Sequence, residues 1–176
     1  MKKAIKLKVV IAVTGASGAQ LGLKAYKKLP PSIQKYLILT KNAQVVLDKE
    51  ENILSDEAIW EGPASGSYGV DAMMVTPCSM NTLAKIAVGI ADNLTTRAAS
   101  VMIKERKALL LAPRELPFSP IALEHMAKLS QLNVIIAPPV LGYYSDPKSI
   151  EEMEDFIIGK WFDLLGIEHN LYKRWQ

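Results

Sequence analysis

A glycine-rich turn near the start of the chain is the feature most able to bind an anion. An apolar, β-branched run that ends at Val13 opens directly into the turn Thr14–Ala19. Gly15 and Gly18 let the backbone approach a phosphate, and Ser17 adds a hydroxyl. The unpaired amides of a following helix would carry partial positive charge toward the same place. The turn therefore predicts a site for a phosphorylated ligand. The alternative interpretation is that these glycines only allow the chain to turn into the helix.

The spacing of this turn narrows the class of ligand. It matches neither the dinucleotide pattern G-x-G-x-x-G nor the Walker pattern G-x-x-x-x-G-K-[ST]. The next apolar run, Tyr36–Leu39, ends in Thr40 and Lys41, where a NAD site carries an acidic residue for the ribose hydroxyl. A mononucleotide is therefore favoured over NAD.

A second turn, Thr76–Leu83, has the same capacity. Ser79 can cap the next helix while its hydroxyl and the neighbouring amides remain near a bound group. An ordinary N-cap is the alternative for Ser79. The turn Thr76–Leu83 and the turn Thr14–Ala19 together predict two anion-binding helix starts on one edge of a sheet.

Three further segments bring polar groups that suit an anionic substrate. Arg114 and Glu115 stand between two prolines, so a cation and a carboxylate follow a strand in a stiff loop. The segment Pro138–Tyr144 ends in two tyrosines, and Ser65 lies in the long glycine-rich loop Glu57–Val70. A surface ion pair, a buried aromatic residue and a plain surface loop are the alternatives.

The elements that must position these residues follow from the hydrophobic pattern, because short apolar runs alternate with segments of helical period. The expected strands are Leu7–Val13, Tyr36–Leu39, Ala72–Val75, Ala108–Leu111 and Val134–Ile136. The expected helices are Ala19–Leu29, Ala43–Lys49, Asn81–Val88, Leu94–Lys104, Ile121–Leu132 and Ile150–Leu165. The pattern predicts an α/β fold, a Rossmann-like doubly wound open parallel sheet with helices on both faces. Its strand-to-helix loops would meet at one edge.

Composition sets the frame for these interpretations. A length of 176 residues with 49% hydrophobic side chains fits a single domain over residues 1–176. A net charge of +3, with Lys and Arg scattered along the chain, argues against a nucleic-acid surface. The single cysteine, Cys78, excludes an intrachain disulfide and a multi-cysteine metal cluster. Because no long apolar span is present, we expect a cytoplasmic protein with no membrane contact.

Taken together, the motifs closely resemble those of the UbiX-type flavin prenyltransferases. The resemblance covers nearly the whole chain, and its motifs recur in order: Thr14–Ala19, Ala64–Ser67, Pro77–Leu83, Asn93–Ala99, Lys104–Arg106, Pro113–Phe118, Gly142–Tyr144 and Arg174–Trp175. Enzymes of that family join a dimethylallyl group to reduced FMN and make the prenylated flavin that UbiD-type decarboxylases use. The resemblance implies the same reaction and a homo-oligomer whose subunits share active sites.

Residue by residue, the resemblance implies two groups of ligand-binding positions. The FMN group is Gly15, Ala16, Ser17, Thr40, Ser79, Met80, Asn81, Thr82 and Arg97. The group around dimethylallyl phosphate is Ser65, Lys104, Arg114, Glu115, Tyr144 and Lys160, with Arg174 and Trp175 closing the site from a C-terminal tail at about 166–176. Thr40 stands where serine is usual, and Lys160 where arginine is common, so a point charge replaces a bidentate fork.

The implied chemistry is the breaking of a carbon–oxygen bond to a phosphate without a metal. Lys104 and Arg114 would neutralise the leaving phosphate, and Glu115 is the candidate acid that protonates its oxygen. The resemblance places Ser17 and Glu50 near the flavin as supports for proton transfer. A tyrosine such as Tyr144 would help to wall the allylic cation.

Two other functions stay open on the sequence alone. The Pro77–Thr82 turn also resembles that of flavin-dependent cysteine decarboxylases, although their substrate-clamp motif and active-site histidine have no match. A non-catalytic FMN carrier would need the glycine-rich turn but no second phosphate site. A Cys78–His125 nucleophile is disfavoured, because a lone cysteine at a strand end is more often a small buried hydrophobe.

Overall fold

The computed structural model describes residues 6–15, 18–41, 43, 52–143 and 146–174. Within these ranges, six parallel strands form a single sheet in the order β3-β2-β1-β4-β5-β6. The strands are β1 (Lys8–Val13), β2 (Gln34–Leu39), β3 (Ile53–Ser55), β4 (Ala72–Cys78), β5 (Ala108–Pro113) and β6 (Ile135–Ile136). This arrangement confirms the predicted doubly wound α/β fold.

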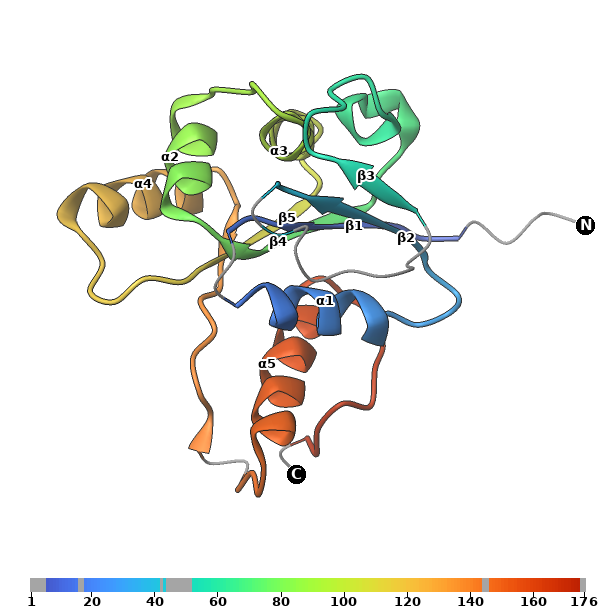
Figure 1. The fold of residues 1–176 in the computed structure, drawn as a ribbon, viewed down its shortest axis with the longest axis vertical. Helices are drawn as coiled ribbons and strands as arrows, with labels where there is room; N and C mark the ends of the chain where they lie inside the picture. The colour runs from blue at the N-terminus through green and yellow to red at the C-terminus, as the bar shows by residue number, and fades with distance from the viewer. Residues whose placement is uncertain (1–5, 16–17, 42, 44–51, 144–145, 175–176) are drawn as a thin grey trace, which may run out of the picture.

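Helices cover both faces of the sheet. They are α1 (Ala19–Lys28), α2 (Met80–Val88), α3 (Leu94–Lys104), α4 (Pro120–Gln131) and α5 (Ile150–Leu164). Figure 1 shows α1 and α5 on one face and α2, α3 and α4 on the other. Alternate residues of the central strands fill the two cores: Val9 and Ile11 face α1 and α5, whereas Val10 and Ala12 face the other layer. Near-continuous apolar strands buried on both faces are typical of parallel sheets.

The strand order reverses direction between β1 and β4, which pair along Val9–Ala12 and Ala72–Val75. Ligands of doubly wound sheets bind in the crevice at the carboxyl ends of the strands on either side of such a switch point. The two anion-binding turns predicted from the sequence, at Gly15 and at Ser79, follow β1 and β4. The topology therefore places both turns where this fold binds its ligands.

Four of the five described α-helices begin with a side-chain cap. Ser79, Asn93, Ser119 and Ser149 each accept a hydrogen bond from the backbone of the first turn that follows. The predicted cap at Ser79 is therefore confirmed. Helix α1 starts instead at Gly18, in the left-handed conformation and without a side-chain cap, so the first turn of α1 depends on other partners for its amides.

The boundaries differ from the expected elements in a few places. At their carboxyl ends, β4 extends three residues and β5 two residues beyond the expected strands. The edge strand β3 was not predicted, because three residues with alternating exposure give too short a period to recognise. The long loop before β4 contains two short 3-10 helices, Gly62–Ala64 and Gly66–Tyr68. The expected helix Ala43–Lys49 lies almost entirely outside the described residues.

Gly22 fixes how closely α1 lies on β4. A Cβ built on Gly22 would stand 2.0 Å from the carbonyl oxygen of Thr76. That neighbour is backbone, so it cannot move aside. We expect Gly22→Ala to lower the free energy of unfolding by about 3 kcal/mol or more, through overpacking.

A matched control for this prediction is Gly89→Ala. A Cβ on Gly89 meets nothing within 4 Å, although the residue has a φ of +80°. That control should lose about 1 kcal/mol, the usual cost of alanine in a left-handed helix cap. Urea unfolding of both variants measures the difference, and an equal loss would contradict close packing at Gly22.

Candidate functional site

Thr14 ties the turn after β1 to the turn after β4. Its amide and its hydroxyl both donate to the carbonyl oxygen of Pro77, at 3.2 and 3.1 Å. The amide of Ser79 in turn donates to the Thr14 hydroxyl oxygen, at 2.9 Å. Thr14 is 2% exposed, so these hydrogen bonds are shielded from water. Thr14 is a positioning residue that the sequence interpretation missed, although a polar residue at the end of an apolar strand was a visible signal.

The glycines of the first turn have the conformations that a close backbone approach requires. Gly15 has a φ of +94° and Gly18 a φ of +82°, in the left-handed region. A Cβ on Gly15 would lie 3.8 Å from the Cβ of Ser79. The two turns are therefore neighbours in space, as the sequence predicted.

Arg114 joins the same place from β5. A Cβ on Gly18 would stand 3.3 Å from both Cδ and Nε of Arg114, and 3.8 Å from Cγ of Pro77. The arginine side chain thus lies across the start of α1, which begins without a side-chain cap. Strands β1, β4 and β5 each deliver one predicted residue to this edge of the sheet.

The start of α2 carries four predicted FMN-binding positions. The Ser79 hydroxyl accepts from the Thr82 amide at 3.2 Å and lies 3.0 Å from the Thr82 hydroxyl. Met80 is half-buried and Asn81 is exposed. The hydroxyls of Ser79 and Thr82 form one polar pair at the helix start. Each hydroxyl is both a donor and an acceptor, which suits a ligand with polar ring atoms.

Thr40 follows β2 at the same edge. Its amide and hydroxyl both donate to the carbonyl oxygen of Val13, at 3.3 and 3.4 Å. Val13 directly precedes Thr14, so Thr40 lies beside the first turn on the side away from Ser79. The predicted FMN-binding residues from three neighbouring strands thus form a row.

Glu115 lies in the exposed loop that follows β5. It follows Arg114 in a loop whose residues 114–117 are exposed, and Leu116 is 93% exposed. Such a loop can meet a substrate or another chain without moving the sheet. Glu115 therefore lies near the carboxyl ends of the strands, beside the two turns that are predicted to bind anions.

Lys104 and Ser65 do not join these residues within the single chain. Lys104 ends α3 just before β5 begins, whereas Arg114 follows the end of β5. A strand of six residues is about 20 Å long, so the two cations lie at opposite ends of it. Lys104 is ion-paired to Glu105, whose carboxylate lies against Gly66, next to Ser65. Within one chain, the predicted substrate-binding residues therefore lie in two places. Arg114 and Glu115 are at the carboxyl ends of the strands, and Lys104 and Ser65 are near their amino ends.

Arg97 is set apart from the Gly15 turn. It is exposed in the first turn of α3, whose start is anchored by Asp56 at the end of β3. The Asp56 carboxylate accepts from the amide of Thr95 at 2.9 Å and from its hydroxyl at 2.6 Å. Because β3 is two strands away from β1, Arg97 is at the carboxyl edge but displaced from the Gly15 turn.

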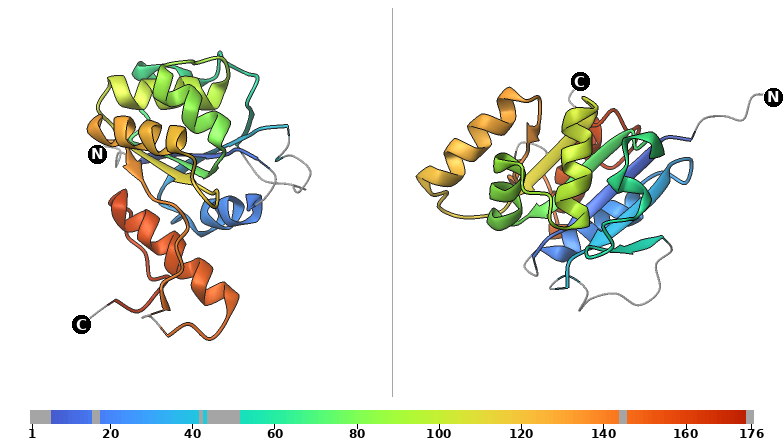
Figure 2. Two further views of the ribbon diagram at one scale, coloured as in Figure 1. Left: turned by 90° about the vertical axis from the view of Figure 1, so that its left-hand side faces the viewer. Right: turned by 90° about the horizontal axis from the view of Figure 1, so that it is seen from above.

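Lys160 and Arg174 belong to the layer of α5. Lys160 is exposed on that helix, and Arg174 lies in the tail that returns along it (Figures 1 and 2). Arg174 donates from Nη2 to Asp163 at 2.7 Å and lines a shallow hollow of about 450 Å³. Partial burial acts to raise the pKa of Asp163, but hydrogen bonds from Tyr172, Arg174 and His169 lower this pKa to about 2. Asp163 is thus held ionised against the tail.

Five predicted site residues lie outside the described residues. They are Ala16, Ser17, Glu50, Tyr144 and Trp175. Their assignments as FMN-binding, catalytic or substrate-binding residues stay predictions.

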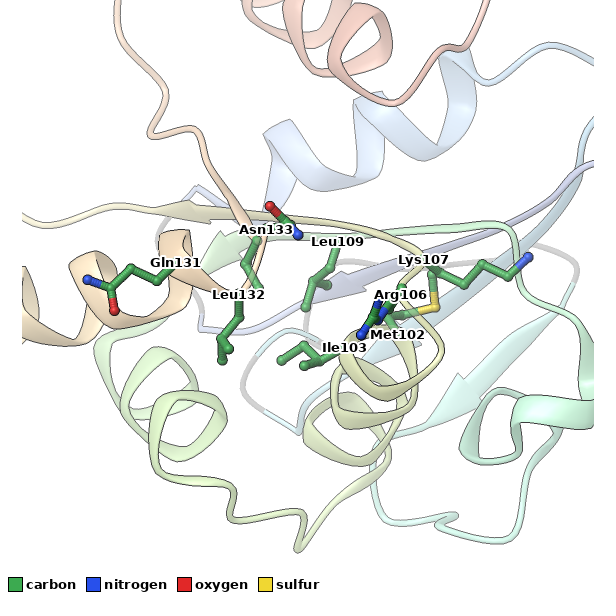
Figure 3. Close-up of a pocket in the computed structure, with 9 residues that line it drawn as sticks. Met102, Ile103, Arg106, Lys107, Leu109, Gln131, Leu132 and Asn133 are labelled. Atoms are coloured by element: carbon green, nitrogen blue, oxygen red, sulfur yellow. The ribbon is translucent and has the colours of Figure 1, made fainter.

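A second hollow, of about 380 Å³, lies away from the predicted site. It is bordered by the end of α3, the start of β5 and the end of α4, and includes Arg106, Lys107 and Leu109 (Figure 3). Ile103 and Leu132 face each other across it, and Lys107 extends away from it. None of the predicted site residues that the structure describes lines this hollow.

The described residues do not support thiol chemistry. Cys78 is 1% exposed, and burial raises the pKa of its thiol to about 12, so it is a buried hydrophobe and not a nucleophile. No group of three or more His, Cys, Asp or Glu side chains within the described ranges could hold a metal ion. None of the helices described between residues 6 and 174 has the length and apolar character that crossing a membrane requires.

This geometry fits a flavin mononucleotide. The left-handed Gly15 lets the backbone of the first turn come close to a ligand, and the uncapped start of α1 adds donors for a phosphate. The Ser79–Thr82 pair and Thr40 add hydroxyls for polar ring atoms. Arg114, whose guanidinium can bind a phosphate with two parallel hydrogen bonds, supplies a fixed charge beside them.

Known proteins and solved structures resemble this chain over nearly its whole length. The model of the Flavoprotein family matches residues 2–161. "Flavin prenyltransferase UbiX" of Helicobacter pylori is 46% identical, over 96% of this chain and 98% of the relative. The crystal structure of AnUbiX (PadA1) in complex with FMN and dimethylallyl pyrophosphate is 34% identical, with a TM-score of 0.92 over 98% of both chains. A dodecameric FMN-dependent UbiX-like decarboxylase from Escherichia coli O157:H7 is 34% identical, with a TM-score of 0.90 over 97% of this chain and all of that one.

Proposed function

Because the chain belongs to the UbiX-type flavin prenyltransferases of the Flavoprotein family, we propose that it transfers a dimethylallyl group from dimethylallyl phosphate to N5 and C6 of reduced FMN. The observation that carries the proposal is the meeting of Gly15, Ser79 and Arg114 at the switch point of the sheet. A flavin phosphate and a second anion can bind there side by side. When bound, reduced FMN supplies the nucleophilic ring atoms for the transfer.

The residues of this chain do the rest of the work. When FMN binds, the turns at Gly15 and Ser79 would hold it at the carboxyl ends of β1 and β4. Arg114 binds the phosphate of the prenyl donor and stabilises the charge that builds as the carbon–oxygen bond breaks. Glu115 gives a proton to the leaving phosphate oxygen. The side chains of this chain thus supply the charge stabilisation that breaking the carbon–oxygen bond requires.

The division of the substrate-binding residues supports a homo-oligomer with shared sites. Lys104 and Ser65 lie at the edge of the sheet opposite Arg114, so one chain cannot surround a donor with all of them. We propose that the amino ends of the strands in one copy face the carboxyl ends of the strands in another copy and complete its site.

The product is then passed to a UbiD-type decarboxylase, in a cytoplasmic compartment that keeps flavin and Cys78 reduced.

The test of the reaction is the mass of the product flavin. The purified protein is incubated without oxygen with chemically reduced FMN and dimethylallyl phosphate, and in parallel with the diphosphate. A flavin heavier by one five-carbon isoprenoid unit supports the proposal. Unchanged flavin with both donors would reject it in favour of an FMN carrier, and decarboxylation of a cysteine substrate would favour the alternative enzyme.

Shared sites predict complementation between two inactive variants. Glu115→Gln and Lys104→Ala chains are co-expressed, so that they mix in one assembly. If Glu115 and Lys104 of one site come from different copies, about a quarter of the sites regain both residues, and product formation returns in that proportion. Mixed assemblies as inactive as either parent would show that each site uses residues of one chain.

A further inference from the structure

The tail after α5 is fastened to the helix through one carboxylate. Asp163 accepts from the Nη2 group of Arg174 at 2.7 Å and from the Tyr172 hydroxyl, and its Oδ1 lies 3.1 Å from Nε2 of His169. The Leu171 amide donates to Nδ1 of His169 at 3.1 Å. With that nitrogen as the acceptor, Nε2 carries the proton and donates to Asp163. Three tail side chains therefore converge on one acidic group.

The helix surface is shaped to receive the tail. A Cβ on Gly159 would stand 2.5 Å from the Tyr172 ring and 2.7 Å from Cε1 of His169, so the two rings need a glycine beneath them. The ring centroids of Phe156 and Tyr172 are 5.1 Å apart, edge to face. The His169 side chain is 3% exposed. The tail is packed against the helix as well as hydrogen-bonded to it.

This fastening has a consequence for two of the predicted phosphate-binding cations. Lys160 precedes Asp163 by three positions on α5, and side chains three apart on a helix are neighbours. Arg174 uses one of its several N–H donors on Asp163 and keeps 59% of its side chain exposed. Lys160 and Arg174 both keep exposed side chains, one on α5 and the other on the tail that Asp163 fastens to α5.

We propose that Asp163 is a positioning residue that holds Arg174 beside Lys160, so that the prenyl phosphate meets two cations already arranged on one surface of α5 and its tail. Asp163 itself does not touch the substrate, and it acts through Arg174. The inference rests on the proposed function, because that function supplies the phosphate.

The first test measures the tail alone and needs no prenyl transfer. Trypsin cuts after Lys173 and Arg174, and mass spectrometry follows the loss of the last residues. Asp163→Asn should be cut about tenfold faster than the unaltered chain, because hydrogen bonds to a charged group are lost. The matched control is Asp155→Asn, which removes an ion pair of the same helix with Lys28, 2.8 Å long, on the side of α1. Equal cutting of the two variants would overturn the role of Asp163.

The second test separates positioning from general damage. Asp163→Asn should raise KM for dimethylallyl phosphate about tenfold, with kcat and the affinity for FMN within about twofold of the unaltered chain. Arg174→Ala should do the same, and the double variant should be no worse than Arg174→Ala alone. Losses that add in the double variant, or a KM that Asp163→Asn leaves unchanged, would refute positioning through Arg174.

The two tests fail in different ways. If the unaltered chain makes no prenylated flavin, the proposed function is wrong, while the trypsin comparison still decides whether Asp163 fastens the tail. If the unaltered chain is active and trypsin cuts both variants alike, only the role of Asp163 is wrong. Where Asp163→Asn unfolds, Gly159→Ala displaces the same rings with the carboxylate intact, and should also speed cleavage and raise KM.

Discussion

The Glu115→Gln variant should bind FMN as tightly as the unaltered chain and yet form prenylated flavin at least about a hundredfold more slowly. Glutamine keeps the shape of glutamate but has no carboxyl proton to give to the leaving phosphate oxygen. FMN binding should survive, because Glu115 is exposed in the loop beyond the Gly15 and Ser79 turns.

Two measurements under the same anaerobic conditions check this prediction. Fluorescence titration gives the affinity for FMN, and the rate of product formation is followed at saturating dimethylallyl phosphate. Glu124→Gln removes an exposed carboxylate of α4 and serves as the control, with an unchanged rate. Full turnover by Glu115→Gln would exclude Glu115 as the acid.

The parts of this site that were predictable are those set by the backbone. Glycines with a positive φ and a helix cap leave a local mark in the sequence, so Gly15, Gly18 and Ser79 could be placed at one edge before the structure was known. Because the strands are parallel, the turns that follow them lie at the same edge of the sheet. The fold was also predictable, because long apolar strands leave a local pattern in the sequence.

The parts that were not predictable depend on long-range contacts. The family resemblance groups Lys104 with Arg114, yet the short connection from α3 to β5 places Lys104 at the other end of that strand within one chain. Asp163 carries no motif of its own, because its partners come from a tail that folds back over Gly159. Edge strand β3 was missed because three residues carry no usable period.

The second large effect is expected at Arg114. Arg114→Ala should lower kcat/KM for dimethylallyl phosphate by about a hundredfold to a thousandfold, the usual loss when a preorganised donor to a developing charge is removed. Arg114→Lys should recover part of this loss, because it keeps the charge but not the planar fork that binds a phosphate with two hydrogen bonds. Lys128→Ala, which removes an exposed cation of α4, should have no effect.

Gly18→Ala connects this effect to the geometry of the site. The new methyl group would stand 3.3 Å from Cδ and Nε of Arg114, on a backbone with a φ of +82° that alanine adopts at a cost of about 1 kcal/mol. If Arg114 acts from that place, Gly18→Ala should reduce kcat/KM in the unaltered chain, and should reduce it much less in the Arg114→Ala background. Steady-state kinetics of the four chains measures the coupling. Equal losses in both backgrounds would mean that Arg114 acts from somewhere other than its place against Gly18.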